Sequence, residues 1–279
     1  MTYLFDQAIA LQHDASGTGH SGHPGYVRNY QGSTHPAWMN MVGPFGGITG
    51  AALLNAVLQH PQLLGEPIAM TVNFCAAVAD GAYQLQATPV RTNRSTQHWT
   101  MQLIQNGETV ITGTAVTAAR RQTWSAQDAP MPLVGKPDDY APGTSPLPWT
   151  QRYEMRAVTG PLPSVWDGRE ASSLTQLWVR DAEQRALDMA SLVALCDVFF
   201  PRVYIRRAKL VPIGTVSLTT YFHCDAAQLA SLPQDAGGYV LGQARALNFR
   251  NGFFDQTALV WSVDGHLLAS THQTVYYKE

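Results

Sequence analysis

Two stretches of this sequence, "NGETVITGTAVTA" (residues 106–118) and "DGHLLASTHQTVY" (residues 264–276), share one pattern and decide the fold. Each begins with a dipeptide, Asn-Gly or Asp-Gly, that is typical of a tight hairpin turn. Each then continues as a long strand rich in β-branched residues. The chain therefore contains an internal repeat, which constrains its architecture more strongly than any single motif.

Both copies of the repeat place a buried helix before their strands. Residues 51–58 carry apolar side chains on most faces, and residues 182–200 are predicted to form a second helix that Pro201 ends. Further strand patterns lie around these helices, and we also expect a short strand at residues 3–11. A helix too apolar for solvent has to be wrapped by its own sheet, which is the hotdog arrangement.

We therefore predict an α+β double hotdog, in which two helix-wrapped antiparallel sheets join edge to edge as a pseudo-dimer. Joining the sheets covers strand edges that would otherwise be exposed. Residues 125–150 are rich in Pro, Asp and Gly and read as a linker. The predicted domains are an N-terminal hotdog at 1–124, the linker at 125–150 and a C-terminal hotdog at 151–279.

Composition excludes several classes of function. Of the 279 residues, 45 % are hydrophobic and 14 % are charged, and the net charge is -2, so the chain lacks the basic footprint of a nucleic-acid or anionic-membrane binder. Its 3 cysteines form no CxxC motif, and the histidines at 13, 20 and 23 match no metal site, so we expect no metal and no cofactor. Without a signal peptide or a long apolar run, a soluble cytoplasmic protein is expected.

One acidic residue stands out within the second apolar helix. In "MASLVALCDVFFP" (residues 189–201), Asp197 is the single carboxylate. An ionised group that is buried alone is costly, so Asp197 needs either partners or a chemical role. Alternatively, Asp197 is not buried, and its carboxylate reaches solvent at the end of the helix.

Four segments of the chain carry a family resemblance, and they are, in order, "AWMNMVGPFGGITGAALLNAV", "LCDVFFP", "IGTVSLTTYFH" and "DGHLLASTHQTVYY". Together they resemble the bacterial type II acyl-CoA thioesterases, the TesB-like enzymes of the thioesterase-like superfamily, which are double hotdogs. The resemblance spans roughly residues 20–279.

The resemblance implies a set of catalytic residues. In that family an Asp, a Thr and a Gln hold the water that attacks the thioester, and the matching positions here are Asp197, Thr215 and Gln273. Gly46 and Gly47 begin the first helix, whose exposed N–H groups suit a developing oxyanion. The implied substrate is an acyl-CoA, which is cleaved to a free acid and CoA.

The two copies are not equivalent in this respect. Ala115 aligns with Gln273, and the nearest counterpart of Asp197 on the first helix is Asn55, which cannot act as a base. We therefore expect one working site per chain. Arg91, Arg94 and Arg250 are candidates for contacts with CoA phosphates, although solvated surface is the default reading for each.

Three alternatives stay open from the sequence. A hotdog protein that binds an acyl thioester without turnover would share the same fold. A hotdog dehydratase is disfavoured, because neither helix carries the His that such enzymes use. The acyl chain, the choice between CoA and acyl carrier protein, and the formation of a homo-oligomer are not fixed by the residues.

Overall fold

The computed structural model describes residues 2–14, 26–169, 172–232 and 237–279. The elements of the first half are α1 (Leu4–Ala8), β1 (Gln12–Asp14), β2 (Arg28–Ser33), η1 (Pro36–Trp38), α2 (Gly46–Leu58), β3 (Glu66–Phe74), β4 (Ala82–Thr92), β5 (Thr96–Gln105) and β6 (Glu108–Ala118). Those that follow are η2 (Pro137–Asp139), η3 (Pro148–Arg152), β7 (Tyr153–Thr159), β8 (Thr175–Asp181), α3 (Met189–Leu195), α4 (Arg202–Arg207), β9 (Ile213–Phe222), α5 (Ala226–Ala230), β10 (Val240–Arg245), β11 (Phe249–Arg250), β12 (Phe253–Ser262) and β13 (Leu267–Tyr277).

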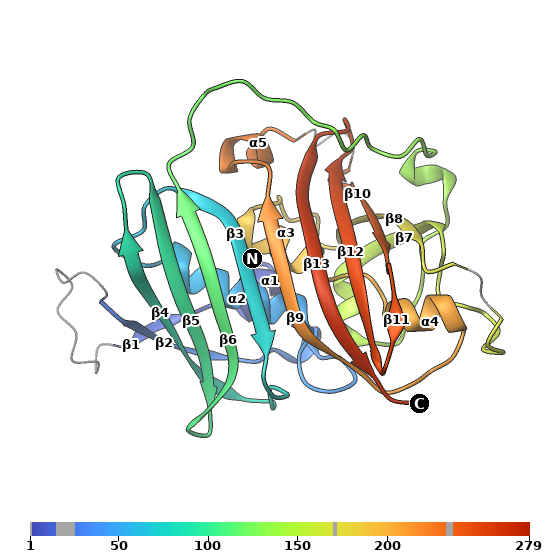
Figure 1. Cartoon of the computed structure of the whole chain (residues 1–279), viewed down its shortest axis with the longest axis horizontal. Helices are drawn as coiled ribbons and strands as arrows, with labels where there is room; N and C mark the ends of the chain where they lie inside the picture. The colour runs from blue at the N-terminus through green and yellow to red at the C-terminus, as the bar shows by residue number, and fades with distance from the viewer. Residues whose placement is uncertain (1, 15–25, 170–171, 233–236) are drawn as a thin grey trace.

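All of these strands belong to one antiparallel sheet, whose order is β1-β2-β4-β5-β6-β3-β9-β13-β12-β10-β8-β7, with β11 beside β12. The order β2-β4-β5-β6-β3 in the first half is mirrored by β8-β10-β12-β13-β9 in the second. Figure 1 shows β3 and β9 side by side at the centre of the sheet, where the two halves meet. The predicted double hotdog is confirmed.

A pair of threonines marks the join between the halves. Thr71 of β3 lies opposite Thr219 of β9, and their Oγ1 atoms are 2.9 Å apart. Their neighbours Met70, Val72 and Leu218 are buried on the inner face, so the two threonines point to the outer face. The seam is therefore an ordinary antiparallel ladder, and it leaves neither half with an open edge there.

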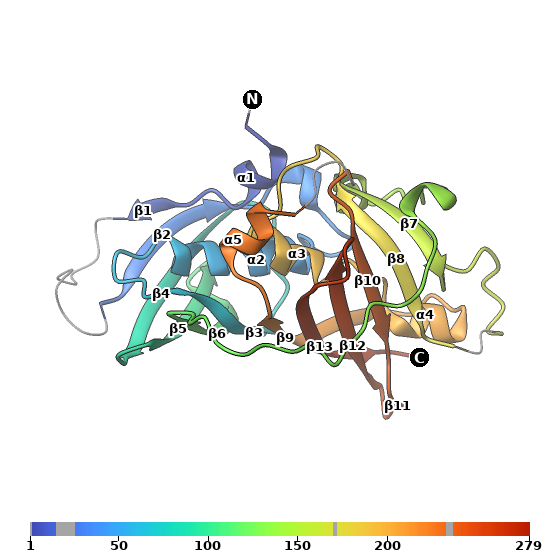
Figure 2. The same cartoon turned by 90° about the horizontal axis from the view of Figure 1, so that it is seen from above.

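The two central helices lie inside the curve of the sheet (Figure 2). Along α2, Ala51 to Leu54 are at most 1 % exposed, so this helix has no polar face and depends on packing for its stability. It lies very close to α3, because a Cβ atom at Gly50 would sit 3.1 Å from Cγ1 of Val193. Both helices contribute to one hydrophobic core that is shared by the two halves.

Two sequence predictions about helices are wrong in detail. Residues 4–8 form α1 instead of a strand, because Phe5, Ala8 and Ile9 are the buried positions, and their spacing is that of one helix face. The helix predicted at 182–200 is limited to α3. Asp188 caps it, since its side chain accepts a hydrogen bond from the backbone N–H of Ser191 (2.8 Å) in a capping box.

The predicted linker forms a third layer over the outer face of the second half. The indole of Trp178 donates to the carbonyl of Gly135 (2.9 Å), and that of Trp261 donates to the carbonyl of Ala129 (3.0 Å). Both tryptophans are at most 3 % exposed as a result. The domain boundaries at 1–124, 125–150 and 151–279 stay a prediction.

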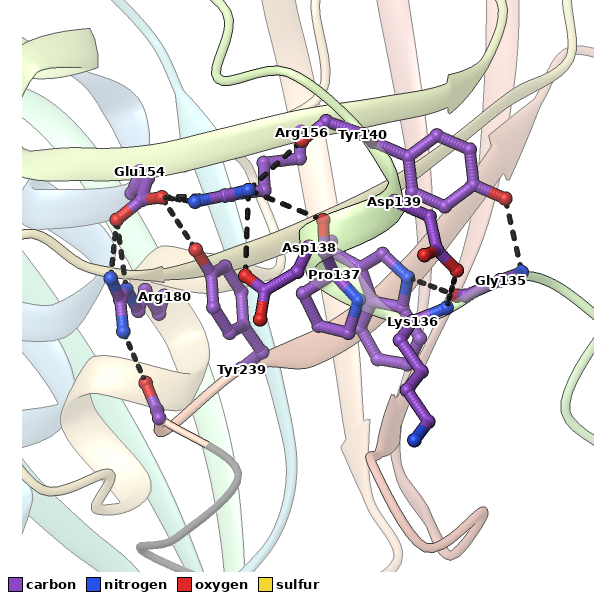
Figure 3. A network of polar contacts seen from close by, with 12 residues as sticks. Gly135, Lys136, Pro137, Asp138, Asp139, Tyr140, Glu154, Arg156, Arg180 and Tyr239 are labelled. Atoms are coloured by element: carbon purple, nitrogen blue, oxygen red, sulfur yellow. Dashed lines mark hydrogen bonds and ion pairs between the residues drawn. The ribbon is translucent and has the colours of Figure 1, made fainter.

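A partly buried polar network fixes the linker to β7 and β8 (Figure 3). Glu154 accepts from Arg156, Arg180 and the hydroxyl of Tyr239, each at 2.6 Å, and Arg156 also donates to the carbonyl of Tyr140 at 2.9 Å. Burial alone would raise the pKa of Glu154, but hydrogen bonds from Tyr239, Arg180 and Arg156 lower it from 4.5 to about 2. The ionised carboxylate therefore stabilises the folded chain.

We expect Glu154→Gln to lower the free energy of unfolding by about 1–2 kcal/mol at pH 7, because hydrogen bonds to a charged acceptor are replaced by weaker ones. The pKa of Glu154 is lower in the folded than in the unfolded state, so the difference should persist above about pH 4.5 and fade as the pH drops toward 2. Urea unfolding across this pH range measures it. Asp167→Asn, in an exposed ion pair, is the control. If Glu154→Gln lowers the free energy of unfolding by the same amount at pH 2 and at pH 7, the lowered pKa of Glu154 is contradicted.

Candidate active site

A cavity of about 630 Å³ opens at the junction of the two halves. Its wall takes residues from the start of α2, the end of β3, η3, the segment after α3, and strands β9, β12 and β13. The volume lies within the range of small-molecule sites. Most of the lining is apolar, and Phe45, Phe74, Phe199, Phe200 and Trp149 are among the side chains that form it.

Three of the predicted catalytic residues, Asp197, Thr215 and Gln273, line this cavity together. Asp197 follows the end of α3, Thr215 lies near the start of β9, and Gln273 lies in the middle of β13. They come from separate segments of the second half. Their convergence on one wall was expected only from the family resemblance.

The carboxylate of Asp197 is held by one hydrogen bond and faces a second N–H group. The side-chain amide of Gln273 donates to Oδ1 at 2.7 Å, and the backbone N–H of Gly47 favours the charged carboxylate as well. Burial raises the pKa of Asp197 from 3.8 to about 7, although both of these groups act in the opposite direction. The group can therefore gain and lose a proton near neutral pH, as a general base must.

Thr215 reaches the cavity because of a β-bulge. In the pairing of β13 with β9, Thr274 lies opposite Ser217 and Val275 lies opposite Thr215, which leaves Val216 without a partner. Strict alternation from the inward-facing Leu218 would turn Thr215 to the outer face. The extra residue reverses this and puts Thr215 on the inner face with Val275.

Within the part of the chain that the structure describes, no hydrogen bond joins Thr215 to Asp197 or Gln273. The structure thus places the amide and the carboxylate in direct contact, whereas the hydroxyl shares only the cavity with them.

The two predicted glycines lie where α2 begins against the end of α3. A Cβ at Gly46 would lie 2.8 Å from Oδ2 of Asp197, and one at Gly47 would lie 2.7 Å from the carbonyl oxygen of Ala194. Any larger residue would push the helix start away from the carboxylate. Gly46 lines the cavity, whereas the N–H of Gly47 is directed at Asp197.

Two cavity residues were missed from the sequence. Gln256 is 2 % exposed and lies opposite Gln273 in the β12–β13 ladder. The sequence could have predicted this position, because alternation along β12 puts Gln256 on the same inward face as Phe254 and Ala258. Trp149, which seemed part of a linker, stacks on Phe45 with ring centroids 4.2 Å apart.

Four other tryptophans are buried and are not part of the cavity lining, namely Trp38, Trp99, Trp178 and Trp261. The counterparts of the catalytic residues in the first half have structural roles. Asn55 donates to the carbonyl of Ile9 at 2.7 Å, and Ala115 is 2 % exposed in the core.

Among the described residues, no three His, Cys, Asp or Glu side chains are grouped to hold a metal ion. His13 lies in β1, whereas His20 and His23 lie outside the described residues. None of the described helices combines the length and apolar composition needed to cross a bilayer.

Comparison with known families assigns both halves of the chain. Residues 35–118 match the family described as the acyl-CoA thioesterase N-terminal domain, and residues 125–277 match the acyl-CoA thioesterase C-terminal domain. A search of curated proteins by sequence gives no match.

Solved structures agree with this fold. A conserved hot dog fold protein of unknown function from Alicyclobacillus acidocaldarius is 43 % identical, with a TM-score of 0.88 over 100 % of this chain and 99 % of that one. A TesB protein from Mycobacterium avium subsp. paratuberculosis (13 % identity, TM-score 0.75, 99 % and 98 % covered) has the same fold. So does the acyl-CoA thioesterase II TesB2 from Mycobacterium marinum (15 % identity, TM-score 0.72, 98 % of each chain covered). The chain belongs to the acyl-CoA thioesterase family and is a TesB-like double hotdog.

Proposed function

We propose that this thioesterase hydrolyses acyl-CoA with a water molecule activated by Asp197 and positioned by Thr215 and Gln273. The observation that carries the proposal is the Asp197 carboxylate, which is held by Gln273 at the wall of a largely apolar cavity. The apolar wall suits an acyl chain. The carboxylate supplies the base that the reaction needs.

The chemistry follows from these positions. Gln273 donates to Oδ1 of Asp197, and a remaining lone pair of the carboxylate accepts a proton from water. The water oxygen then bonds to the thioester carbon, and collapse of the tetrahedral intermediate breaks the carbon–sulfur bond. The proton held on Asp197 passes to the departing thiolate, which restores the carboxylate. The Thr215 hydroxyl and the remaining polar atoms of Gln273 orient the water.

Gly46 is the proposed donor to the oxyanion. It lines the cavity at the first position of α2, where backbone N–H groups lack partners within the helix and the helix dipole is positive. Gly47 supports the site differently, because its backbone N–H favours the charged form of Asp197. The cytoplasmic location and a homo-oligomeric state stay predictions.

Asp197→Asn should reduce kcat by at least about a hundredfold, because an amide cannot accept the proton from water. Thiol release from a panel of acyl-CoAs measures this, and Asp128→Asn in the exposed part of the linker is the control. A variant with the kcat of the unaltered protein would remove Asp197 from the mechanism. If the unaltered protein releases no thiol from any chain length, the cavity is a binding site without turnover.

The pH dependence of kcat/KM should show a limb at about pH 7, below which activity falls as Asp197 becomes protonated. Gln273→Leu removes a donor that lowers this pKa, so the limb should move to higher pH. Gln84→Leu removes an exposed amide in the first half and should leave the limb in place. If the limb stays at the same pH in Gln273→Leu, Gln273 does not influence the pKa of the catalytic base.

The same carboxylate should lower stability. The pKa of Asp197 is higher in the folded than in the unfolded state, so its ionisation opposes folding above about pH 4, increasingly up to about pH 7. Asp197→Asn should therefore raise the free energy of unfolding by roughly 2–4 kcal/mol at pH 8 and leave it nearly unchanged at pH 3. Denaturant titrations at both pH values measure the difference. A loss of stability at pH 8 would mean that the carboxylate has a structural role.

A further inference from the structure

Gln256 is a buried amide on the wall of the active-site cavity, and the proposed mechanism does not use it. It lines the cavity, is 2 % exposed, and lies directly opposite Gln273 in the β12–β13 ladder. Within the described part of the chain, no residue forms a hydrogen bond with its side chain. An amide that is withdrawn from water without a partner costs free energy, so we expect a ligand in the cavity to supply that partner.

The equivalent pair in the first half of the chain is apolar and closed. There Trp99 of β5 lies opposite Ala115 of β6, and both are at most 2 % exposed. The indole of Trp99 donates to the hydroxyl of Thr117 at 3.1 Å, so its N–H has a partner within the fold. The second half has two amides where the first half has an indole and a methyl group, and the cavity lies against these amides.

The place of Gln256 in the sheet decides which part of a substrate it meets. Strand β13 lies between β9 and β12, so Thr215 is on one side of Gln273 and Gln256 is on the other. The proposed water lies on the side of Thr215. Opposite side chains on neighbouring strands have Cβ atoms about 4.5–5.5 Å apart. Gln256 therefore faces a group that is bonded a short way along the substrate from the reacting carbon.

Burial indicates that this group belongs to the acyl chain and not to its carrier. Phe254, on the same inward face of β12 as Gln256, also lines the cavity and is 2 % exposed. Leu210 and Trp166 line the cavity as well but are 63 % and 39 % exposed, so they mark its mouth. The carrier has to extend to solvent through this mouth, and the enclosed part of the wall is left to contact the acyl chain.

We infer that Gln256 selects acyl groups that carry a hydroxyl close to the thioester, on the third carbon of the chain. A side-chain amide has both donors and an acceptor, and a hydroxyl can pair with both kinds of group. The third carbon is two bonds from the reacting carbon, which agrees with a displacement of one strand from Gln273. In a mostly apolar cavity, one such polar group fixes orientation and specificity. The inference rests on the proposed function and names its substrate class, the 3-hydroxyacyl thioesters.

Gln256→Met tests the inference, because methionine is similar in size and flexibility to glutamine but has no amide. The unaltered protein should hydrolyse a 3-hydroxyacyl-CoA with a kcat/KM at least about tenfold above that for the unsubstituted acyl-CoA of the same length. In Gln256→Met this ratio should fall to about one, through loss of activity on the hydroxylated substrate. Gln102→Met, which replaces an exposed amide of β5, is the matched control and should keep the ratio. The inference is overturned if the unaltered protein has no such preference, or if Gln256→Met lowers kcat/KM equally for both substrates.

Binding keeps this test separate from turnover. In calorimetry, Asp197→Asn should bind the 3-hydroxyacyl-CoA at least about tenfold more tightly than the unsubstituted acyl-CoA, and Asp197→Asn/Gln256→Met should bind both equally. If this preference is found but the unaltered protein cleaves no thioester, the selectivity stands and the hydrolytic proposal fails. If Asp197→Asn binds both ligands equally, the inference is overturned.

Unfolding in urea distinguishes a ligand-binding amide from a structural one. Gln256→Met should unfold at the same urea concentration as the unaltered protein or at a higher one, because it removes a buried amide that has no partner in the fold. A clear shift of the midpoint to lower urea would show that the amide stabilises the fold, and it would overturn the inference.

Discussion

The contact between the start of α2 and the end of α3 is the constraint on which the rest of the structure depends. Both helices are enclosed by one curved sheet, so neither can move away from the other without opening the core. Glycines at the start of α2 allow the backbone to approach Asp197 closely. The burial that gives this carboxylate its raised pKa is thus a product of helix packing.

That packing also explains why two hotdogs are needed for one site. The second half supplies Asp197, Thr215 and Gln273, but the backbone N–H that favours the charged carboxylate belongs to Gly47 in the first half. At the corresponding positions the first half has Asn55 and Ala115 in place of Asp197 and Gln273. The half that carries the proposed catalytic residues and the half that supports them are joined along β3 and β9.

The architecture could be predicted from the sequence because its signals are local and occur twice. Asn106-Gly107 and Asp264-Gly265 mark equivalent turns, and the strands around them alternate clearly. Helix limits were less predictable. The capping of α3 by Asp188 depends on a hydrogen bond with Ser191, and residues 182–187, which are mostly good helix formers, extended the predicted helix too far.

The candidate site was predictable to a different degree for each residue. Asp197 stands out by itself as a charge in an apolar run, and Gln256 would have been found by following alternation along β12. Alternation gives the wrong face for Thr215, because the bulge at Val216 arises from the pairing of β9 with β13. Only the family resemblance placed that hydroxyl in the site. Trp149 was hidden because its stacking partner, Phe45, is remote in sequence.

The segment between the halves behaves as part of the fold, although its composition is that of a flexible spacer. Its carbonyl groups at Ala129 and Gly135 each have a fixed tryptophan partner, and η2 is anchored by Arg156. A free tether tolerates changes of length, because only its reach matters. Here an insertion or deletion would shift the carbonyls out of phase with their indoles, so the fold fixes the number of residues between them.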